Sequence, residues 1–371
     1  MPDILLSLPS HRPPSGIVEN VQVLATVFAY TVLGFVADVS YDVLRITRLV
    51  PLVRPSTDYG SSDVDQWTED QTLERYSSTC EEEDPDLPPL PAEENPSHVR
   101  VWPFTRDTVC KYASCRDDEE PTPEPLTLDI VFHHTTIPVP RVRRTLRVMD
   151  DTGRFIMGMP FVMDRIPGRR LDEAWPALSF FGKLRVAYML RSYVRQLRAI
   201  RHPRSLVPGP VAPGSLPVAP QIVAFAGVMG TSVPPFPDAA ALAVWFEKHH
   251  ARSVASFPKF HTGIPREPFA GAAPLVLTHC DIAMRNVILG DDGRVYLIDW
   301  ELSGFYPPWL EYVGWRNWIG MRREMQIPHT LDTTDRLWYM LLPFMTMGPY
   351  NREEWWYQRV NPSINAMWRL D

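Results

Sequence analysis

The sequence predicts an α+β protein in which a small antiparallel sheet precedes a larger helical region. Between residues 99 and 163, short apolar runs alternate with turn residues, which is typical of strands. From Phe180 to Leu197, apolar residues recur at steps of three and four, which is the period of a helix. The chain has 371 residues, more than the roughly 100–200 of an ordinary domain, so two lobes are expected.

An apolar run near the N-terminus, residues 21–37, ends at Asp38. Its length is at the short limit for a membrane span. If it spanned, the arginines that follow would keep the rest of the chain cytosolic: Arg45, Arg48 and Arg54. Polar residues dilute the run, and we therefore expect a buried helix packed on the main domain, with membrane contact as the alternative: Gln22, Thr26, Tyr30 and Thr31.

An acidic segment follows at residues 58–98. It holds thirteen acidic residues and one base, Arg75, so its net charge is −12. Because the net charge of the whole chain is −7, the remaining residues carry +5. Because it is rich in proline and poor in aliphatic residues, we expect a linker or mobile insert. A partner-binding acidic tail is the alternative. The expected organisation is 1–57 as an N-terminal hydrophobic region, 58–98 as linker, 99–166 as sheet lobe and 167–371 as helical lobe.

The elements of the predicted sheet lobe come in order along the chain. Turn residues, including the segment 150–153, separate its strands, and two prolines extend the chain after its one helix. The strands are expected at 99–102, 108–112, 141–149 and 155–163, and the helix at 126–134.

The helical lobe begins after Gly168. A proline-rich stretch, 203–237, is expected to be mostly loop, and a helix is expected over 239–250. The apolar runs 287–289 and 294–298 flank a Gly-Asp-Asp-Gly turn and predict a β-hairpin.

Charge and cysteine content exclude some function classes. The net charge of −7 argues against nucleic acid as a partner, since phosphate binding needs clustered positive charge. The four cysteines are too few and scattered for a disulfide framework, which favours a reducing, cytoplasmic location: Cys80, Cys110, Cys115 and Cys280.

Three polar residues flank the predicted hairpin: Asp281, Asn286 and Asp299. If Leu289 pairs with Arg294, Asn286 and Asp299 meet at the same end of the hairpin. An amide oxygen and a carboxylate there suit a hard cation such as Mg²⁺. Asp281, in the loop entering the hairpin, is placed to accept a proton from a hydroxyl that attacks phosphorus. The alternative is a polar turn in which Asp and Asn occur by chance and have no chemical role.

Seven collinear segments resemble the aminoglycoside phosphotransferase and choline kinase family, in its fungal branch, over about residues 99–320. They are Cys110–Tyr112, Thr136–Val142, Phe161–Gly168, Leu171–Trp175, Gln196–Arg198, His279–Asn286, and Ile298–Glu301 with Gly304–Pro307. The resemblance implies a two-lobed protein-kinase-like fold, with a small antiparallel-sheet N-lobe, a larger helical C-lobe and ATP between them.

The resemblance also implies roles for single residues. Asp281 matches the catalytic base, and Asn286 and Asp299 match the metal ligands. Lys111 lies on the strand that supplies a lysine to the ATP phosphates, and Glu124 is similar in position to the glutamate that pairs with this lysine. The stretch Asp164 to Ile166 resembles the hinge whose backbone binds adenine. His279 is expected to brace the catalytic loop through a hydrogen bond.

Two departures from the family pattern concern the nucleotide. No glycine lies between Gly60 and Gly153, so the glycine-rich loop is missing and residues 93–98 take its place. An acidic run at 116–120 would repel phosphate if it folded inward. A catalytically impaired relative that serves as a binding or scaffold module is therefore the alternative to an active enzyme.

The acceptor is expected to be a hydroxyl of a small molecule. Only residues 300–309 separate Asp299 from the next helix pattern, which leaves no room for a peptide-docking segment. The aromatic residues that follow, with Glu301 and Glu311 among them, could bind a cationic amine. We favour packing of these aromatic rings in the core: Trp300, Phe305, Tyr306, Trp309, Tyr312, Trp315 and Trp318.

Overall fold

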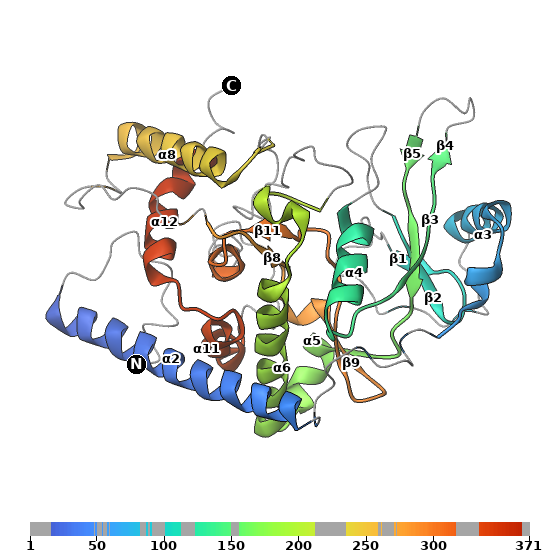
Figure 1. Cartoon of the computed structure of the whole chain (residues 1–371), viewed down its shortest axis with the longest axis horizontal. Coiled ribbons are helices and arrows are strands. Elements are labelled where there is room, and N and C mark those ends of the chain that lie inside the picture. Colours follow the sequence, from blue (N-terminus) through green and yellow to red (C-terminus); the bar gives the residue numbers. More distant parts are fainter. Residues whose placement is uncertain are drawn as a thin grey trace.

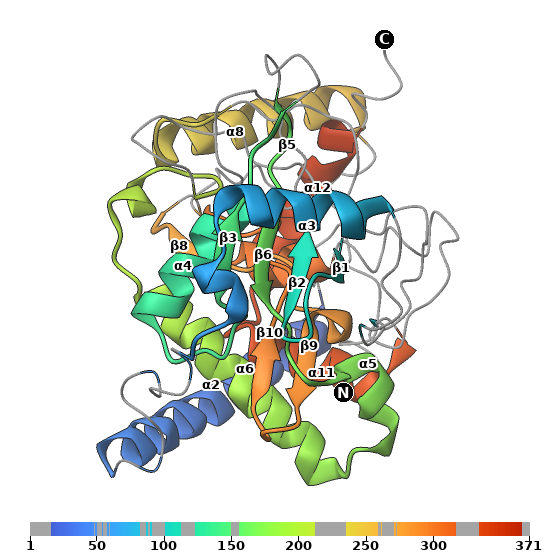
Figure 2. The ribbon, with the colours of Figure 1, turned by 90° about the vertical axis from the view of Figure 1, so that its right-hand side faces the viewer.

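The computed structural model of the chain has a sheet lobe and a helical lobe (Figure 1). The strands β1, β2, β3 and β6 gather at one side with α3 and α4, and the longer helices α6, α8, α11 and α12 form the other side (Figures 1 and 2). The structure describes residues 16–47, 49, 54, 58, 60–81, 87, 90, 101–112, 123–149, 156–211, 235–258, 261, 271, 273–316 and 334–365.

The sheet lobe is a four-stranded antiparallel sheet of order β1-β2-β6-β3. Each long strand predicted at 141–149 and 155–163 is divided in two at Leu146 and Pro160, where the amide of Leu146 donates to the carbonyl of Pro160 at 2.8 Å but no bond returns. Pro160 has no N–H with which to continue the pairing. The strands are β1 (Val101–Pro103), β2 (Thr108–Lys111), β3 (Val142–Thr145), β4 (Val148–Met149), β5 (Ile156–Gly158) and β6 (Phe161–Asp164).

Helix α4 (Pro123–His134) begins three residues before the predicted start at Leu126. Prolines fit the first turn of a helix, where the missing N–H has no intrahelical acceptor. Pro123 and Pro125 therefore do not delay the helix, and Glu124 lies in its first turn, buried at 3% exposure.

The expectation of a linker over 58–98 is wrong for residues 60–81. They form a short 3-10 helix, η2 (Asp63–Gln66), and helix α3 (Glu69–Glu81), which pack on the outer side of the sheet. Val64 is fully buried, and Tyr76 contacts Trp102 with ring centroids 5.7 Å apart. Arg143 of β3 donates to Asp65 at 2.8 Å. The segment is acidic on average, but its few apolar residues pack with residues of the sheet into a small hydrophobic core that is separate from the main one.

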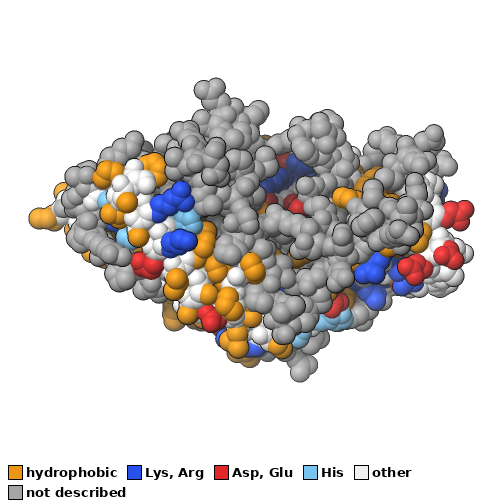
Figure 3. Space-filling view, turned by 90° about the horizontal axis from the view of Figure 1, so that it is seen from above, with side chains coloured by type: hydrophobic (Ala, Val, Ile, Leu, Met, Phe, Trp, Pro, Cys, Tyr) orange, Lys and Arg blue, Asp and Glu red, His pale blue; other side chains and the backbone are white. Residues whose placement is uncertain are grey.

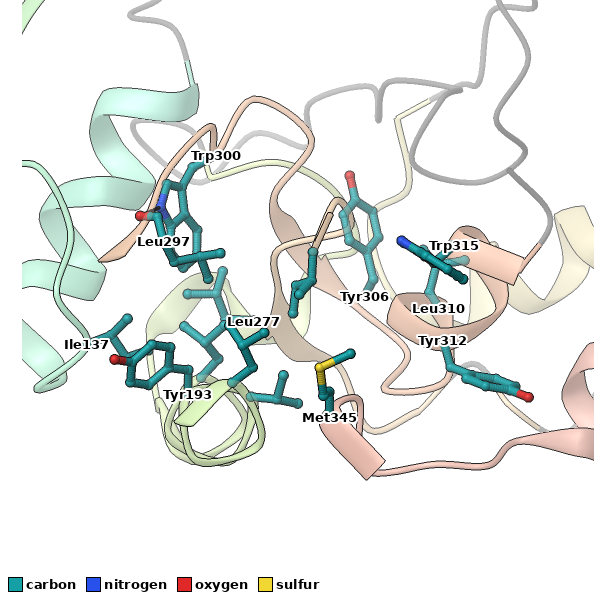
Figure 4. Packing of buried hydrophobic residues seen from close by; sticks show 14 of the residues in the cluster. Ile137, Tyr193, Leu277, Leu297, Trp300, Tyr306, Leu310, Tyr312, Trp315 and Met345 are labelled. Carbon is teal, nitrogen blue, oxygen red and sulfur yellow. Dashed lines mark hydrogen bonds between the residues drawn. The ribbon is translucent and has the colours of Figure 1, made fainter. Parts of the chain in front are cut away.

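The helical lobe is built around α6 (Phe180–Ala199), whose buried face packs on α11 (Arg336–Met345) and on β8 (Val276–Thr278). The Tyr193 hydroxyl donates to the carbonyl of Val295 at 2.7 Å. Figure 4 shows Tyr193, Leu277, Leu297 and Trp300 in this core. The remaining elements are α5 (Leu171–Ala174), η4 (Trp175–Ala177), η5 (Pro203–Leu206), α8 (Ala239–Ser256), where a helix over 239–250 was predicted, and α12 (Asn351–Asn365).

The predicted hairpin is formed by β9 (Val287–Gly290) and β10 (Val295–Leu297), but its register differs by one residue from the prediction. Leu289 pairs with Val295 rather than Arg294. Gly293, with φ of +79°, adds one left-handed residue after the turn, which is the geometry of a glycine bulge. Asn286 consequently lies opposite Ile298, whose amide donates to the Asn286 carbonyl at 3.0 Å.

Two further strand pairs position this hairpin. Strand β7 (Gly168–Arg170) pairs with β9 directly after the chain leaves the sheet lobe, and β8 (Val276–Thr278) pairs with β11 (Gly304–Tyr306). At Gly168, with φ of +151°, a Cβ atom would stand 2.3 Å from the carbonyl oxygen of Leu289. Only glycine allows this approach, so Gly168 fixes how the connection between the lobes crosses the hairpin.

Helix α2 (Ile17–Ile46) packs on the helical lobe, but the expectation that it is buried is wrong. Its contacts with α6 and α11 cover one face, with Thr26, Gly34, Ala37 and Tyr41 buried. Large apolar side chains on the other face stay exposed; Phe28, for example, is 70% exposed. Within the described residues, α2 is the one helix long and apolar enough to cross a membrane.

Candidate active site

Lys111, Glu124 and Asp299 form an ionic cluster that joins the two lobes. Lys111 is the last residue of β2, Glu124 lies in the first turn of α4, and Asp299 follows β10. The Lys111 Nζ lies 2.7 Å from Glu124 Oε2 and donates to Asp299 Oδ1 at 2.6 Å. Glu124 Oε1 also accepts from the backbone amide of Trp300 at 3.0 Å. One glutamate thus links a strand, a helix and the segment after the hairpin.

Burial and charge act in opposite directions on this cluster. Burial would lower the pKa of the Lys111 ammonium, but the facing Asp299 and Glu124 carboxylates outweigh it and raise the pKa. Burial likewise opposes ionisation of Asp299, yet the Lys111 charge holds the pKa of Asp299 below its usual value. For Glu124, burial outweighs the attraction of Lys111 and raises the pKa. Asp299 keeps 36% of its side chain exposed, so it is the member of the cluster that a ligand can reach.

Asp281 is held from two sides within its own loop. Arg285 Nη2 donates to Asp281 Oδ1 at 2.7 Å and to Oδ2 at 2.5 Å. Asn286 Nδ2 donates to Asp281 Oδ2 at 2.8 Å and to the Asp281 carbonyl at 2.9 Å. The Asp281 side chain is 16% exposed. Its carboxylate is therefore fixed in orientation but open on one side.

His279 braces the loop, as expected. Its Nδ1 accepts from the Asp281 amide at 3.2 Å, and its Nε2 donates to the carbonyl of Ile298 at 3.0 Å. Burial lowers the pKa of His279, so the ring is neutral with the proton on Nε2. The imidazole therefore connects the loop to the segment that carries Asp299.

Glu311 holds the same loop from the helical lobe. Its Oε2 accepts from the amides of His279 at 2.8 Å and of Cys280 at 3.1 Å. Cys280 has φ of +64°, a backbone conformation that is unusual outside glycine and is maintained here by the surrounding bonds. Because Glu311 is buried at 3% exposure, it is occupied in positioning the loop and is not a surface for a cationic ligand.

Asn286 and Asp299 lie at the same end of the hairpin, as predicted. The hydrogen bonds among described residues use Asn286 Nδ2 and Asp299 Oδ1, which leaves one side-chain oxygen of each for a ligand. Two hard oxygen donors fit Mg²⁺, which keeps several waters and takes its other ligands from phosphate. Among described residues there is no cluster of three or more His, Cys, Asp or Glu that could hold a metal ion.

The hinge segment, Asp164 to Ile166, connects β6 to β7. The Asp164 carboxylate accepts from Arg143 Nε at 2.6 Å, and the amides of Asp164 and Arg165 donate to the carbonyls of Arg141 and Asp107. The Asp164 side chain is therefore structural. Among the described residues, the backbone of Ile166 takes part in no hydrogen bond, so it is the hinge position whose amide and carbonyl are open to a ligand.

Figure 3 shows a hollow near the middle of the molecule in which acidic and basic side chains are visible. The structure brings Lys111, Glu124 and Asp299 into contact, and Asp281 into contact with Asn286. Asp164 and Ile166 lie in the connection between the lobes. The residues expected to replace the glycine loop, 93–98, and the acidic run 116–120 lie outside the described residues.

Sequence reasoning missed the positions of Arg285 and Glu311. Arg285 is four residues after Asp281 in the loop, a spacing at which an ion pair is common, and that signal was available. Glu311 was noticed only as a possible amine ligand, because no sequence pattern indicates that a carboxylate will cap the backbone of a distant loop. The aromatic residues after Asp299 within the described part are buried in the core, as favoured, including Trp300, Trp309 and Trp315; Trp318 lies outside it.

Residues 89–332 match the sequence profile of the phosphotransferase enzyme family, APH. No curated protein matches the chain at a significant level.

Similar solved structures include a thermostable mutant of aminoglycoside phosphotransferase APH(4)-Ia in complex with AMP-PNP and hygromycin B, at 15% identity, covering 76% of this chain and 94% of that one, with a TM-score of 0.36. The streptomycin–ATP complex of APH(2")-IIa is 12% identical over 67% of this chain and 75% of that one, with a TM-score of 0.37. Choline kinase LicA from Streptococcus pneumoniae is 14% identical over 80% and 88%, with a TM-score of 0.36.

Proposed function

Because the chain belongs to the phosphotransferase enzyme family, whose fold is two-lobed and protein-kinase-like, we propose that it transfers the γ-phosphoryl group of ATP, with Mg²⁺, to a hydroxyl of a small molecule. The observation that carries this proposal is the ionic cluster of Lys111, Glu124 and Asp299, which spans both lobes. It places a fixed positive charge beside a partly exposed carboxylate, the pairing that phosphate and its metal require.

The nucleotide would lie between the lobes. Lys111, oriented by Glu124, would contact the phosphates as a point charge. The backbone of the Asp164–Ile166 hinge would bind adenine, and the open amide and carbonyl of Ile166 support this placement. Asn286 and Asp299 would hold Mg²⁺, which neutralises charge on the phosphate oxygens when it is bound.

Asp281 would act as the base. As the acceptor oxygen attacks the γ-phosphorus, its proton passes to the Asp281 carboxylate, the bond from the γ-phosphorus to the bridging oxygen breaks, and ADP leaves with that electron pair. Arg285 and Asn286 fix the direction of the carboxylate. A base held in one orientation lowers the barrier by positioning, because no rotation of the carboxylate is then required.

A small acceptor is supported by the path of the chain after Asp299. Residues 304–306 form β11, which pairs with β8, and a helical turn follows at 310–316. Trp300, Phe305 and Trp309 are buried at 3% exposure or less. This segment is thus part of the core and offers no extended platform for a peptide.

The test combines binding and turnover in the full chain. Mg²⁺-ATP should raise the melting temperature of the wild type but not that of Asp299→Ala. Slow ATP hydrolysis should be lost in Asp281→Asn and kept in Asp129→Asn, a matched change at an exposed position of α4. If the wild type shows no nucleotide shift, the phosphotransferase proposal fails. Nucleotide binding without hydrolysis, and without transfer in a metabolite screen, would instead assign a non-catalytic binding module.

A further inference from the structure

The side of α2 that faces away from the helical lobe is apolar along the whole helix. At 100° per residue, thirteen residues fall within an arc of about 120°. One of them, Asp42, lies at the edge of the arc, and of the other twelve the eleven larger ones are between 43% and 85% exposed. Every one of the twelve is Ala, Val, Ile, Leu or Phe. They are Ile17, Val18, Val21, Leu24, Ala25, Phe28, Val32, Phe35, Val36, Val39, Val43 and Ile46. We call this set the α2 apolar face.

Polar contacts along one edge of the α2 apolar face hold the helix on the protein. Asp38 accepts two hydrogen bonds from Arg191 of α6, at 3.0 and 2.9 Å, and Asp42 pairs with Arg195 at 2.7 Å. Gly34 lies so close to Arg191 that a Cβ atom there would stand 2.5 Å from the guanidinium. These contacts fix the rotation of the helix about its axis. The polar side therefore faces the body and the apolar side faces solvent, the reverse of an ordinary surface helix.

We propose that α2 lies in the surface of a lipid bilayer, with the α2 apolar face between the headgroups and the acyl chains, and holds the helical lobe at the membrane. A second copy of the chain fits this face less well, because a helix pair buries a seam of about two residues in seven. A specific protein partner would also need polar groups to fix its register, and the one polar residue of the arc, Asp42 at its edge, is already paired with Arg195. A bilayer covers a wide convex apolar arc and requires no donor within it.

The helix lies along the membrane and does not cross it. Its contacts with the body begin inside the apolar run, where the Tyr30 hydroxyl donates to the Met340 carbonyl, and continue beyond the end of the run to the Asp42–Arg195 pair. Crossing would require the helix to leave the body and would break these bonds. Positive charge at the C-terminal end of α2, from Arg45, would attract anionic headgroups.

The placement of α2 leaves the candidate active site open. The helix runs along the lower edge of Figure 1, beside α6 and α11 and away from the sheet lobe, and Figure 2 agrees. The hollow between the lobes faces the viewer in Figure 3, which looks from above. A membrane against α2 would therefore not cover the hollow.

Pelleting with vesicles tests the proposal on the full chain. The wild type should pellet with phosphatidylcholine vesicles, and more strongly when they contain 30% phosphatidylserine, about the fraction that gives a distinct negative surface potential. The change Leu24→Glu with Phe35→Glu should lower the partition coefficient at least about tenfold. The control Leu206→Glu with Val244→Glu changes exposed apolar residues away from α2 and should pellet like the wild type.

Two results would overturn the proposal: a wild type that stays in the supernatant with both vesicle types, or a Leu24→Glu, Phe35→Glu variant that pellets undiminished. Because both residues are exposed, the variant should fold, and the same pair changed to serine should give a smaller loss without added charge. Sedimentation equilibrium without vesicles should show a monomer. A dimer that the glutamates abolish would assign the face to a second copy instead.

Discussion

Replacing Glu124 with glutamine removes one charge from the cluster that joins the lobes while keeping the side-chain shape. The Lys111 ammonium, 7% exposed in its side chain, would then have Asp299 as its one carboxylate contact among the described residues. Glutamine can still accept from the Trp300 amide and from Lys111 through its oxygen. The change therefore isolates the charge of Glu124 from its hydrogen bonds.

The expected change in stability follows from two opposing effects. At an effective dielectric constant of 20, two unit charges 2.7 Å apart attract by about 6 kcal/mol. Removing the charge also removes the desolvation cost of the carboxylate, and this cost outweighs the attraction, because burial raises the pKa of Glu124 to about 7. We therefore expect the free energy of unfolding at pH 8 to be unchanged or to rise by up to about 3 kcal/mol.

Urea unfolding of the full chain at pH 8 measures the change in stability. As a control, Glu173→Gln makes the same change at an exposed position of α5 and should alter the free energy of unfolding by no more than about 0.5 kcal/mol. Under the proposed function, the KM for ATP should also rise at least about tenfold, because Lys111 is less firmly oriented. A Glu124→Gln variant that is less stable than the wild type at pH 8, or one with unchanged ATP dependence, would refute the reasoning.

Three further predictions concern the loop and the connection between the lobes. Burial raises the pKa of Glu311 to about 7, although the amides of His279 and Cys280 and the charge of Arg198 oppose this rise. Because the pKa of Glu311 is higher in the folded than in the unfolded protein, its protonated form stabilises the fold at pH values below the unfolded pKa. This stabilisation is lost as the pH rises through 7 and the group ionises. The free energy of unfolding of the wild type relative to Glu311→Gln should thus fall by up to about 3 kcal/mol between pH 4.5 and 8, and a difference independent of pH in urea unfolding would contradict this. Gly168→Ala should lower the free energy of unfolding by about 3 kcal/mol or more, because the added Cβ would meet a backbone oxygen. The control Gly293→Ala, at φ of +79° but with open space around it, should lower it by about 1 kcal/mol. Equal melting temperatures of the two variants would argue against the contact at Gly168. Arg285→Ala should lower kcat about 10- to 100-fold through a less fixed Asp281 while leaving the ATP-induced thermal shift intact, with partial recovery in Arg285→Lys; loss of the thermal shift would show that Arg285 acts on the nucleotide.

The hairpin and the residues around it were predictable because their information is local. A Gly-Asp-Asp-Gly turn between apolar runs predicts the hairpin, and the spacing of Asn286 and Asp299 places both at one end of it. The register was wrong by one residue, because the turn alone does not show that Gly293 adds a bulge. Since Asn286 and Asp299 lie at the end of the hairpin rather than on one face of a strand, the error did not separate them.

Long-range packing was the part that the sequence could not supply. The segment 60–81 looked like a linker because composition averages over residues, whereas folding depends on a few of them, such as Val64 and Tyr76, meeting a surface that accepts them. For α2, apolar composition was equally consistent with burial and with a membrane. The contacts of Asp38 and Asp42 decide which side faces the body, and their partners are about 150 residues away.

The ionic cluster also bears on whether the chain is an enzyme or a scaffold. Burying Lys111 between Glu124 and Asp299 carries a desolvation cost, and well-packed apolar residues at such positions are often as stable or more so. A fold used only as a scaffold gains little from keeping these charges in contact, nor from holding Asp281 through both Arg285 and Asn286. Under the proposed function, the missing glycines would weaken the binding of phosphate without changing these contacts. The arrangement therefore favours an enzyme that binds nucleotide weakly over a scaffold, and the Mg²⁺-ATP melting shift, followed by hydrolysis in Asp281→Asn, distinguishes the two.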